Sequence, residues 1–184
     1  GSANPVGGQA SMVKFKWGED PKDMMFPGAK SYIKFALGEN VKQSNWGNNP
    51  NRFPQSRGGV EQAFDFWFTR ALEYEKEKST NKNFRKDLRL ETMLEILKSN
   101  RFITCHSYVQ SEINMLMDVA ERFDFRVQTF THILEGYKVA DKMKKHGANA
   151  STFSDWWAYK EEVREAIPYN AALLLQAGVN VAIN

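Results

Sequence analysis

The sequence predicts an α/β fold in which helices flank a parallel sheet, as in part of a TIM-type (β/α)8 barrel. Apolar, β-type runs alternate with amphipathic helical segments through the second half of the chain. Strand starts are expected at 102, 126, 148 and 179, at the spacing of strand–helix repeats. With one earlier strand this makes five, which is too few to close an eight-stranded barrel.

The first part of the chain is expected to contain two strands joined by loops. In order, its elements are a glycine-rich loop at 1–9, a strand at 13–17, a proline-containing loop at 20–28, a strand at 32–37 and a polar loop at 43–59. The strand at 32–37 has the clearest end, because Gly38-Glu39-Asn40 is a sequence typical of turns. The loop at 43–59 is longer than a simple connection requires, which suggests a functional segment.

Two helices and then a regular alternation follow. Helices are expected at 59–78 and 88–98, strands at 102–106, 126–131, 148–152 and 179–183, and further helices at 110–122, 137–145, 158–166 and 169–176. In the helix at 59–78, apolar side chains such as Phe64, Trp67 and Phe68 recur at helical spacing, so one face should pack on the sheet. We interpret residues 1–184 as a single domain.

The composition argues against several classes of function. The net charge is +3, and Lys and Arg are scattered among Asp and Glu, so no basic patch for nucleic acid is expected. No run of about 18 apolar residues is present, so no membrane span is expected. The single cysteine excludes an internal disulfide framework and a cysteine-rich metal cluster, but it leaves the compartment open.

Two of the three histidines, His106 and His132, each end an apolar β-type run. They lie 26 residues apart, about one strand–helix–strand unit. Adjacent parallel strands are about 4.8 Å apart, and barrel active sites lie at the C-terminal strand ends. The pair therefore predicts a shared divalent-metal site, with zinc as the expected ion. His146 precedes Gly147 and is typical of a capped helix end.

An acidic metal ligand could come from either of two residues. Lys34 interrupts the apolar run of 32–37, where a charge is costly unless it is paired or chemically altered. A carbamylated Lys34 would supply two carboxylate-like oxygens, whereas the alternative is an exposed lysine on an edge strand. Glu39, at the end of the same strand, is the rival ligand or an ordinary turn residue. Strand alternation points Lys34 and Glu39 to opposite faces unless Gly38 breaks the register.

Aromatic residues near the strand ends are candidate substrate contacts. Trp156 and Trp157 follow the strand at 148–152, where they could line a substrate pocket or form a hydrophobic lid. Tyr108 lies two residues after His106 and is a further substrate-binding candidate. The substrate is expected to be a small molecule or a dipeptide-like compound, and its selection in such barrels depends on the loops.

Several of these motifs together resemble the amidohydrolase superfamily, in particular its imidazolonepropionase-like and prolidase-like branch. The run Gly28–Lys42, GAKSYIKFALGENVK, is similar to the family's fourth-strand region. Ile103-Thr104-Cys105-His106 and Thr129-Phe130-Thr131-His132 are similar to its fifth- and sixth-strand histidine motifs, and Asn4–Gln9 resembles its glycine-rich loop. The resemblance covers nearly the whole chain.

The resemblance implies a metal-dependent hydrolase acting on amide or related C–N bonds with one or two divalent ions. His106 and His132 would be metal ligands, and carbamylated Lys34 or else Glu39 would be the acidic ligand. Two family features are absent from this sequence: the first-strand His-x-His and the eighth-strand aspartate, which is expected just beyond Asn184. We therefore expect a central fragment, roughly strand four to strand eight, with little or no hydrolase activity alone.

An alternative is a non-catalytic, self-associating interaction module. An open half-barrel leaves unpaired strand edges, which favour homo-oligomers. Exposed aromatic side chains, with Trp67, Phe68, Trp156 and Trp157 as candidates, would add to that tendency.

Overall fold

The computed structural model describes residues 2–42, 52–153 and 159–183. Within them, six strands form one sheet in sequence order: β1 (Val6–Ala10), β2 (Ser31–Ala36), β3 (Arg101–His106), β4 (Val127–Thr131), β5 (Asn149–Thr152) and β6 (Val181–Ile183). Strands β2 to β6 are parallel, whereas β1 pairs antiparallel with β2. The expected α/β fold with a parallel sheet is therefore confirmed, and its five parallel strands are the five expected from the sequence.

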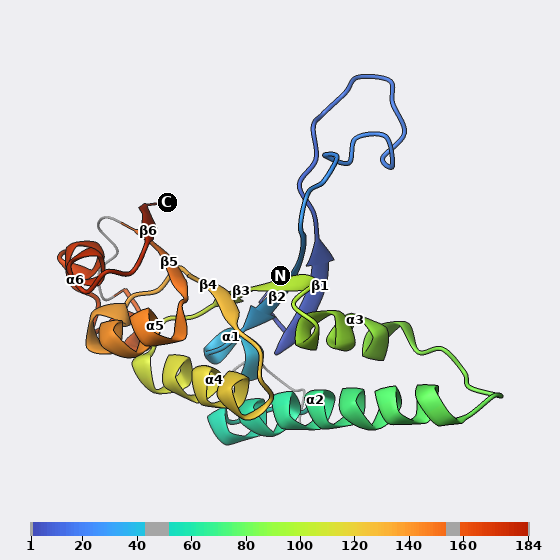
Figure 1. Ribbon diagram of the computed structural model, residues 1–184. Helices are drawn as coiled ribbons and strands as arrows, with labels where there is room; N and C mark the ends of the chain where they lie inside the picture. Colours follow the sequence, from blue (N-terminus) through green and yellow to red (C-terminus); the bar gives the residue numbers. More distant parts are fainter. Residues whose placement is uncertain (1, 43–51, 154–158, 184) are drawn as a thin grey trace.

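Helices connect the strands and pack on the sheet. They are α1 (Glu39–Lys42), α2 (Arg57–Thr80), α3 (Leu88–Leu97), α4 (Gln110–Arg122), α5 (Ala140–His146) and α6 (Asn170–Gln176), with 3-10 turns η1 (Gly136–Lys138) and η2 (Glu161–Val163). Figure 1 shows α2, α3 and α4 along the same side of the sheet. In the described part of the chain, no helix combines the length and apolar character that crossing a membrane requires.

Alternating side chains divide the sheet into an apolar face and a more polar face. On β2, Ile33 and Phe35 are buried, and the Phe35 ring stacks on Phe64 of α2 with centroids 5.2 Å apart. Lys34, between them, points to the other face and is half-buried. The helices therefore cover the apolar face, and the polar face carries the chemistry-bearing residues.

The sheet register brings the C-terminal strand ends to one edge. Ala36 of β2 lies opposite His106 of β3, and His106 lies opposite Thr131 of β4. The pairing of β3 with β4 shifts by one residue between Ile103 and Thr104, and after this shift the two strands stay in register up to His106 and Thr131. The edge formed by the ends of β2, β3 and β4 is where the two histidines were expected to meet.

Three expectations for the local structure are corrected. Residues 6–9, expected in a loop, belong to β1, because they pair with the free side of β2 despite having no strand-like apolar pattern. The strand expected at 13–17 is reduced to one isolated bridge, Val13 to Met25. In place of the helix expected at 158–166, the described part of that range contains only the turn η2.

Candidate functional site

The two histidines predicted from strand endings lie side by side at the C-terminal edge of the sheet. His106 is the last residue of β3 and is buried, and His132 follows β4 directly and is half-buried. Their ring centroids are 5.4 Å apart, with an angle of 65° between the ring planes. The structure therefore brings together the pair on which the predicted site depends.

His132 has an unusual backbone conformation, with φ of 61°. The left-handed region costs a non-glycine residue about 1–2 kcal/mol and persists where surrounding contacts enforce it. Here the next residue, Ile133, donates its N–H to the Ser151 carbonyl at 3.0 Å. The His132 ring also stacks on Phe153, with centroids 5.2 Å apart and an angle of 5°. These contacts direct the imidazole across the strand end toward His106.

Lys34 belongs to the same cluster. Its Nζ donates to the Thr131 hydroxyl at 2.9 Å, and that hydroxyl donates to the Cys105 carbonyl at 3.1 Å. Lys34 thus reaches past β3 to β4, immediately before His132. Because β2 pairs with both β1 and β3, Lys34 is on an interior strand, so the alternative of an edge-strand lysine is wrong.

Burial lowers the pKa of all three bases, and nearby positive charge lowers the pKa values of the two histidines further. Burial lowers the pKa of His106 to about 4, and His132, Lys34 and Lys160 act in the same direction. Burial and then the charge of Lys34 lower the pKa of His132, and burial lowers the pKa of Lys34. Neutral imidazole is the form that coordinates a metal ion, so these shifts prepare both histidines for that role.

The histidine pair fits part of a metal-ligand set. Two imidazoles bound to one tetrahedral zinc at about 2.0–2.1 Å have ring centroids roughly 5 Å apart, close to the spacing seen here. Among the described residues, however, no group of three or more His, Cys, Asp or Glu side chains could hold an ion. Within the described part of the chain, a third protein ligand would therefore come from outside such a group, with a chemically altered Lys34 and Glu39 as the two candidates.

Glu39, the rival acidic ligand, lies at the start of α1 and takes part in ion pairs. Its Oε1 is 2.7 Å from Lys42 Nζ and 3.6 Å from Arg57 Nη2. Arg57 in turn places its Nε 3.3 Å from Glu112 Oε1. As a ligand, Glu39 would have to exchange these cations for the metal ion.

Two buried glutamates that sequence reasoning missed hold the turn between β2 and α1. Glu112, from the first turn of α4, accepts the Gly38 N–H at 3.1 Å, and Glu162 of η2 accepts the Glu39 N–H at 2.8 Å. Burial raises the pKa of Glu112 to about 7. Gly38 adopts φ of +87°, and a Cβ there would lie 2.1 Å from Glu162 Oε1. In the local sequence, only Gly38 indicates that the turn is held by these long-range contacts.

Tyr108 lies beside the histidine pair, and Lys160 covers it. The Tyr108 ring is 4.6 Å from the His106 ring, and Lys160 Nζ is 4.6 Å from the Tyr108 centroid. Lys160 also approaches Glu162 Oε2 to 3.1 Å, and Glu162 accepts the Glu39 N–H, so Lys160 and Glu162 link Tyr108 to the turn after β2. Trp156 and Trp157, the other predicted substrate contacts, lie outside the described residues.

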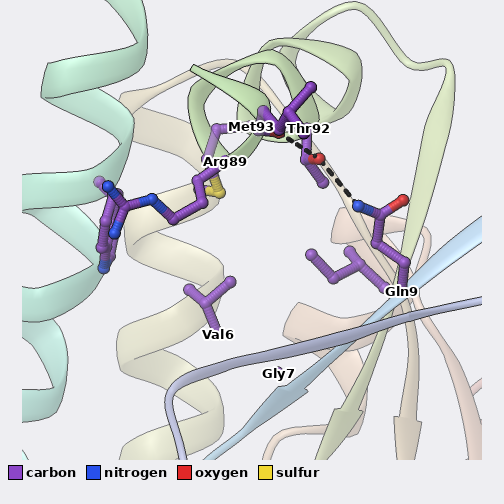
Figure 2. A pocket seen from close by; sticks show the side chains of 9 residues that line it. Val6, Gly7, Gln9, Arg89, Thr92 and Met93 are labelled. Atoms are coloured by element: carbon purple, nitrogen blue, oxygen red, sulfur yellow. Dashed lines mark hydrogen bonds between the residues drawn. The ribbon is translucent and has the colours of Figure 1, made fainter.

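A cavity of about 280 Å³ lies between the sheet and the helices α2 and α3, lined in part by β1 and β2. Figure 2 shows Gln9 and Thr92 facing each other there, with Gln9 Nε2 donating to Thr92 Oγ1 at 3.1 Å. Its other side chains are mainly apolar, and the Arg89 guanidinium stacks on Trp67 at 5.5 Å. None of the residues that line this cavity belongs to the histidine cluster.

Known proteins that resemble this chain carry the name amidohydrolase. The crystal structure of an amidohydrolase from Thermotoga maritima MSB8 superimposes with a TM-score of 0.86 at 27% identity, covering 100% of this chain and 48% of that one. Amidohydrolase tasK from Hapsidospora irregularis is 23% identical over 205 residues, covering 97% of this chain and 21% of that protein. No protein-family model matches. The chain therefore has an amidohydrolase-type α/β fold, with which the barrel expectation is consistent, and spans at most about half of these relatives.

Proposed function

We propose that this chain is part of a metal-dependent amidohydrolase that hydrolyses amide or related C–N bonds. The observation that carries the proposal is the convergence of His106, His132 and Lys34 at the C-terminal edge of parallel strands. The similarity to two proteins named amidohydrolase supports it. A bound divalent ion, with zinc as the first candidate, would supply activation of water and polarisation of the scissile carbonyl.

In this proposal His106 and His132 are the imidazole ligands, and Lys34 or Glu39 provides the acidic one. Burial lowers the pKa of Lys34, which increases the share of unprotonated amine. That amine is the form that adds carbon dioxide to give a carbamate and a proton. Lys34 already lies in the cluster, whereas Glu39 is held in ion pairs with Lys42 and Arg57, so we favour Lys34.

The substrate side of the proposal rests on residues next to the histidines. Tyr108 contacts the His106 ring edge-on and would border a small-molecule or dipeptide-like substrate. Trp156 and Trp157 remain proposed substrate contacts. Only three histidines are present in the sequence, and they supply only part of a ligand set. We therefore propose that the 184-residue chain alone has little or no hydrolase activity.

Metal binding by the purified chain tests the proposal directly. We expect metal-free protein to bind Zn²⁺ in a calorimetric titration, and Co²⁺ to give a visible absorption band on binding at the same site. His106→Ala and His132→Ala should each abolish that binding. His146→Ala is the matched control, because His146 Nε2 accepts the Val127 N–H at 3.1 Å away from the cluster. Equal binding by all three variants, or no binding by the unaltered chain, would refute the site.

Two further variants decide between the acidic ligands. Lys34→Met removes the amine while keeping a side chain of similar length, and Glu39→Gln removes the carboxylate while keeping its shape. If Lys34 is carbamylated, Lys34→Met weakens Zn²⁺ binding, added bicarbonate strengthens binding by the unaltered chain, and Glu39→Gln changes little. The opposite ranking would assign the role to Glu39.

A further inference from the structure

Residues 11–30 form an arm between β1 and β2 that projects from the body of the molecule (Figure 1). Its two sides are joined by the Val13–Met25 bridge, by Lys14 N–H donating to Met24 O at 2.8 Å and by Phe26 N–H donating to Met12 O at 3.1 Å. A two-stranded hairpin with no other support is marginally stable in water. A partner bound along the arm would therefore stabilise the hairpin as well as bury its side chains.

The arm carries large apolar side chains that are unusually exposed. Phe15 is 93% exposed and Trp17 is 104% exposed, and Val13 and Met25 are also exposed. Val13, Phe15 and Trp17 alternate with Lys14 and Lys16 in the sequence, and the bridge to Met25 places Val13 beside a further exposed apolar side chain. Several large apolar side chains exposed on one projecting segment favour an interaction surface.

The charges of the arm change sign along its length. Lys14 lies toward the sheet and Glu19 and Asp20 lie at the outer end, where Lys22 is 3.6 Å from Asp20. Between them Lys16 and Asp23 lie side by side, with Lys16 Nζ donating to the Asp23 carbonyl at 2.9 Å. If two arms pack antiparallel about a twofold axis, the basic part of each lies against the acidic end of the other. This charge pattern is self-complementary, as a twofold interface requires.

We propose that the arm is the interface of a homodimer in which the exposed apolar side chains of two antiparallel arms pack on each other. An aromatic side chain buries about 150–250 Å², so Phe15 and Trp17 from two arms would contribute about 600–1,000 Å². That is about half of the 1,200–2,000 Å² of a standard interface, and Val13, Met25 and the flanking charges add to it. The partner is thus a second copy of this chain.

Sedimentation equilibrium of the 184-residue chain between low and high micromolar concentration tests the dimer. The double variant Phe15→Ser/Trp17→Ser should raise the dimer dissociation constant at least about 100-fold, since buried aromatic anchors dominate interfaces and each change occurs twice. The matched control is Phe66→Ser/Leu175→Ser, which removes two exposed apolar side chains on α2 and α6 and should leave the constant unchanged. A chain that stays monomeric, or a dimer unaffected by the arm variant, overturns the proposal.

Charge reversal tests the antiparallel arrangement specifically. Lys14→Glu/Lys16→Glu makes both ends of the arm acidic, and Glu19→Lys/Asp20→Lys makes both ends basic, so each variant alone should dimerise more weakly. An equal mixture of the two should form a heterodimer, because each altered end then meets its opposite charge. Unfolding of the arm could not be rescued in this way, so failure of the mixture to associate when the unaltered chain dimerises refutes the arrangement.

Discussion

Replacing Glu112 by glutamine is expected to make the protein less sensitive to rising pH. Glu112 is 2% exposed, and burial raises its pKa to about 7 from an ordinary value of 4.5. Between these values the folded protein binds more protons than the unfolded chain. The free energy of unfolding therefore falls as the pH rises from about 4.5 through about 7. The glutamine side chain keeps an oxygen to accept the Gly38 N–H but carries no charge.

The size of the effect follows from the two pKa values. Their difference of about 2.5, at 1.36 kcal/mol per pKa unit, corresponds to about 3 kcal/mol of stability lost when Glu112 ionises in the folded protein. Part of this loss has already occurred at pH 5, so the stability of Glu112→Gln relative to the unaltered chain should increase by about 2 kcal/mol between pH 5 and pH 8. Arg57, at 3.3 Å, already offsets part of the cost of burying this carboxylate.

Urea unfolding followed by circular dichroism at pH 5, 6, 7 and 8 provides the measurement, since urea does not screen charges. Glu121→Gln, an exposed glutamate on the same helix, is the control and should show no comparable trend. A difference between Glu112→Gln and the unaltered chain that is constant from pH 5 to pH 8 would refute the reasoning. It would mean that Glu112 is ionised throughout, with Arg57 compensating its charge fully.

Three further changes test the packing around the site. Phe35→Ala should lower the free energy of unfolding by about 3–5 kcal/mol, because the ring is fully buried against Phe64. Urea unfolding measures this loss, and a value below about 1 kcal/mol would contradict the prediction. By the same measurement, Asp87→Ala should lower the free energy of unfolding by about 1 kcal/mol. The reason is that the Asp87 carboxylate, as the N-cap of α3, accepts hydrogen bonds from the N–H groups of Arg89 and Leu90. Asp87→Asn should retain most of the stability, because an asparagine can also cap the helix. Gly38→Ala should lower the free energy of unfolding by more than about 1 kcal/mol, because φ is +87° and the new methyl group meets the Glu162 side chain. In a double-mutant cycle with Glu162→Ala, additive losses of stability would show that the two residues do not interact.

The parallel part of the fold could be predicted from local pattern. The strands at 32–37, 102–106, 126–131, 148–152 and 179–183 each appear in the structure within two residues of the expected start. Their apolar runs and regular helical intervals are properties of neighbouring residues, which a sequence displays directly. The residues 6–10 show no such run, and only the hydrogen-bonding groups of β2 make them a strand.

The candidate site was only partly predictable for a similar reason. His106 and His132 could be paired because both end strands and parallel strand ends share one edge. The contacts of Glu112 and Glu162 with the Gly38–Glu39 turn join residues that are 74 and 123 positions apart in the sequence. Locally, only the glycine of the turn indicates them. Whether Lys34 or Glu39 faces the histidines likewise depended on how the turn after β2 is held.

The sequence by itself determined the alternation of strands and helices, the apolar face of each, and which histidines stand at strand ends. Those properties follow from side-chain period and local backbone preference. Tertiary structure alone decided the antiparallel β1, the burial that lowers the pKa values of His106 and His132, and the reach of Lys34 to Thr131. Desolvation and hydrogen bonds between distant segments arise only when the chain packs, and they turn two separate strand endings into one cluster.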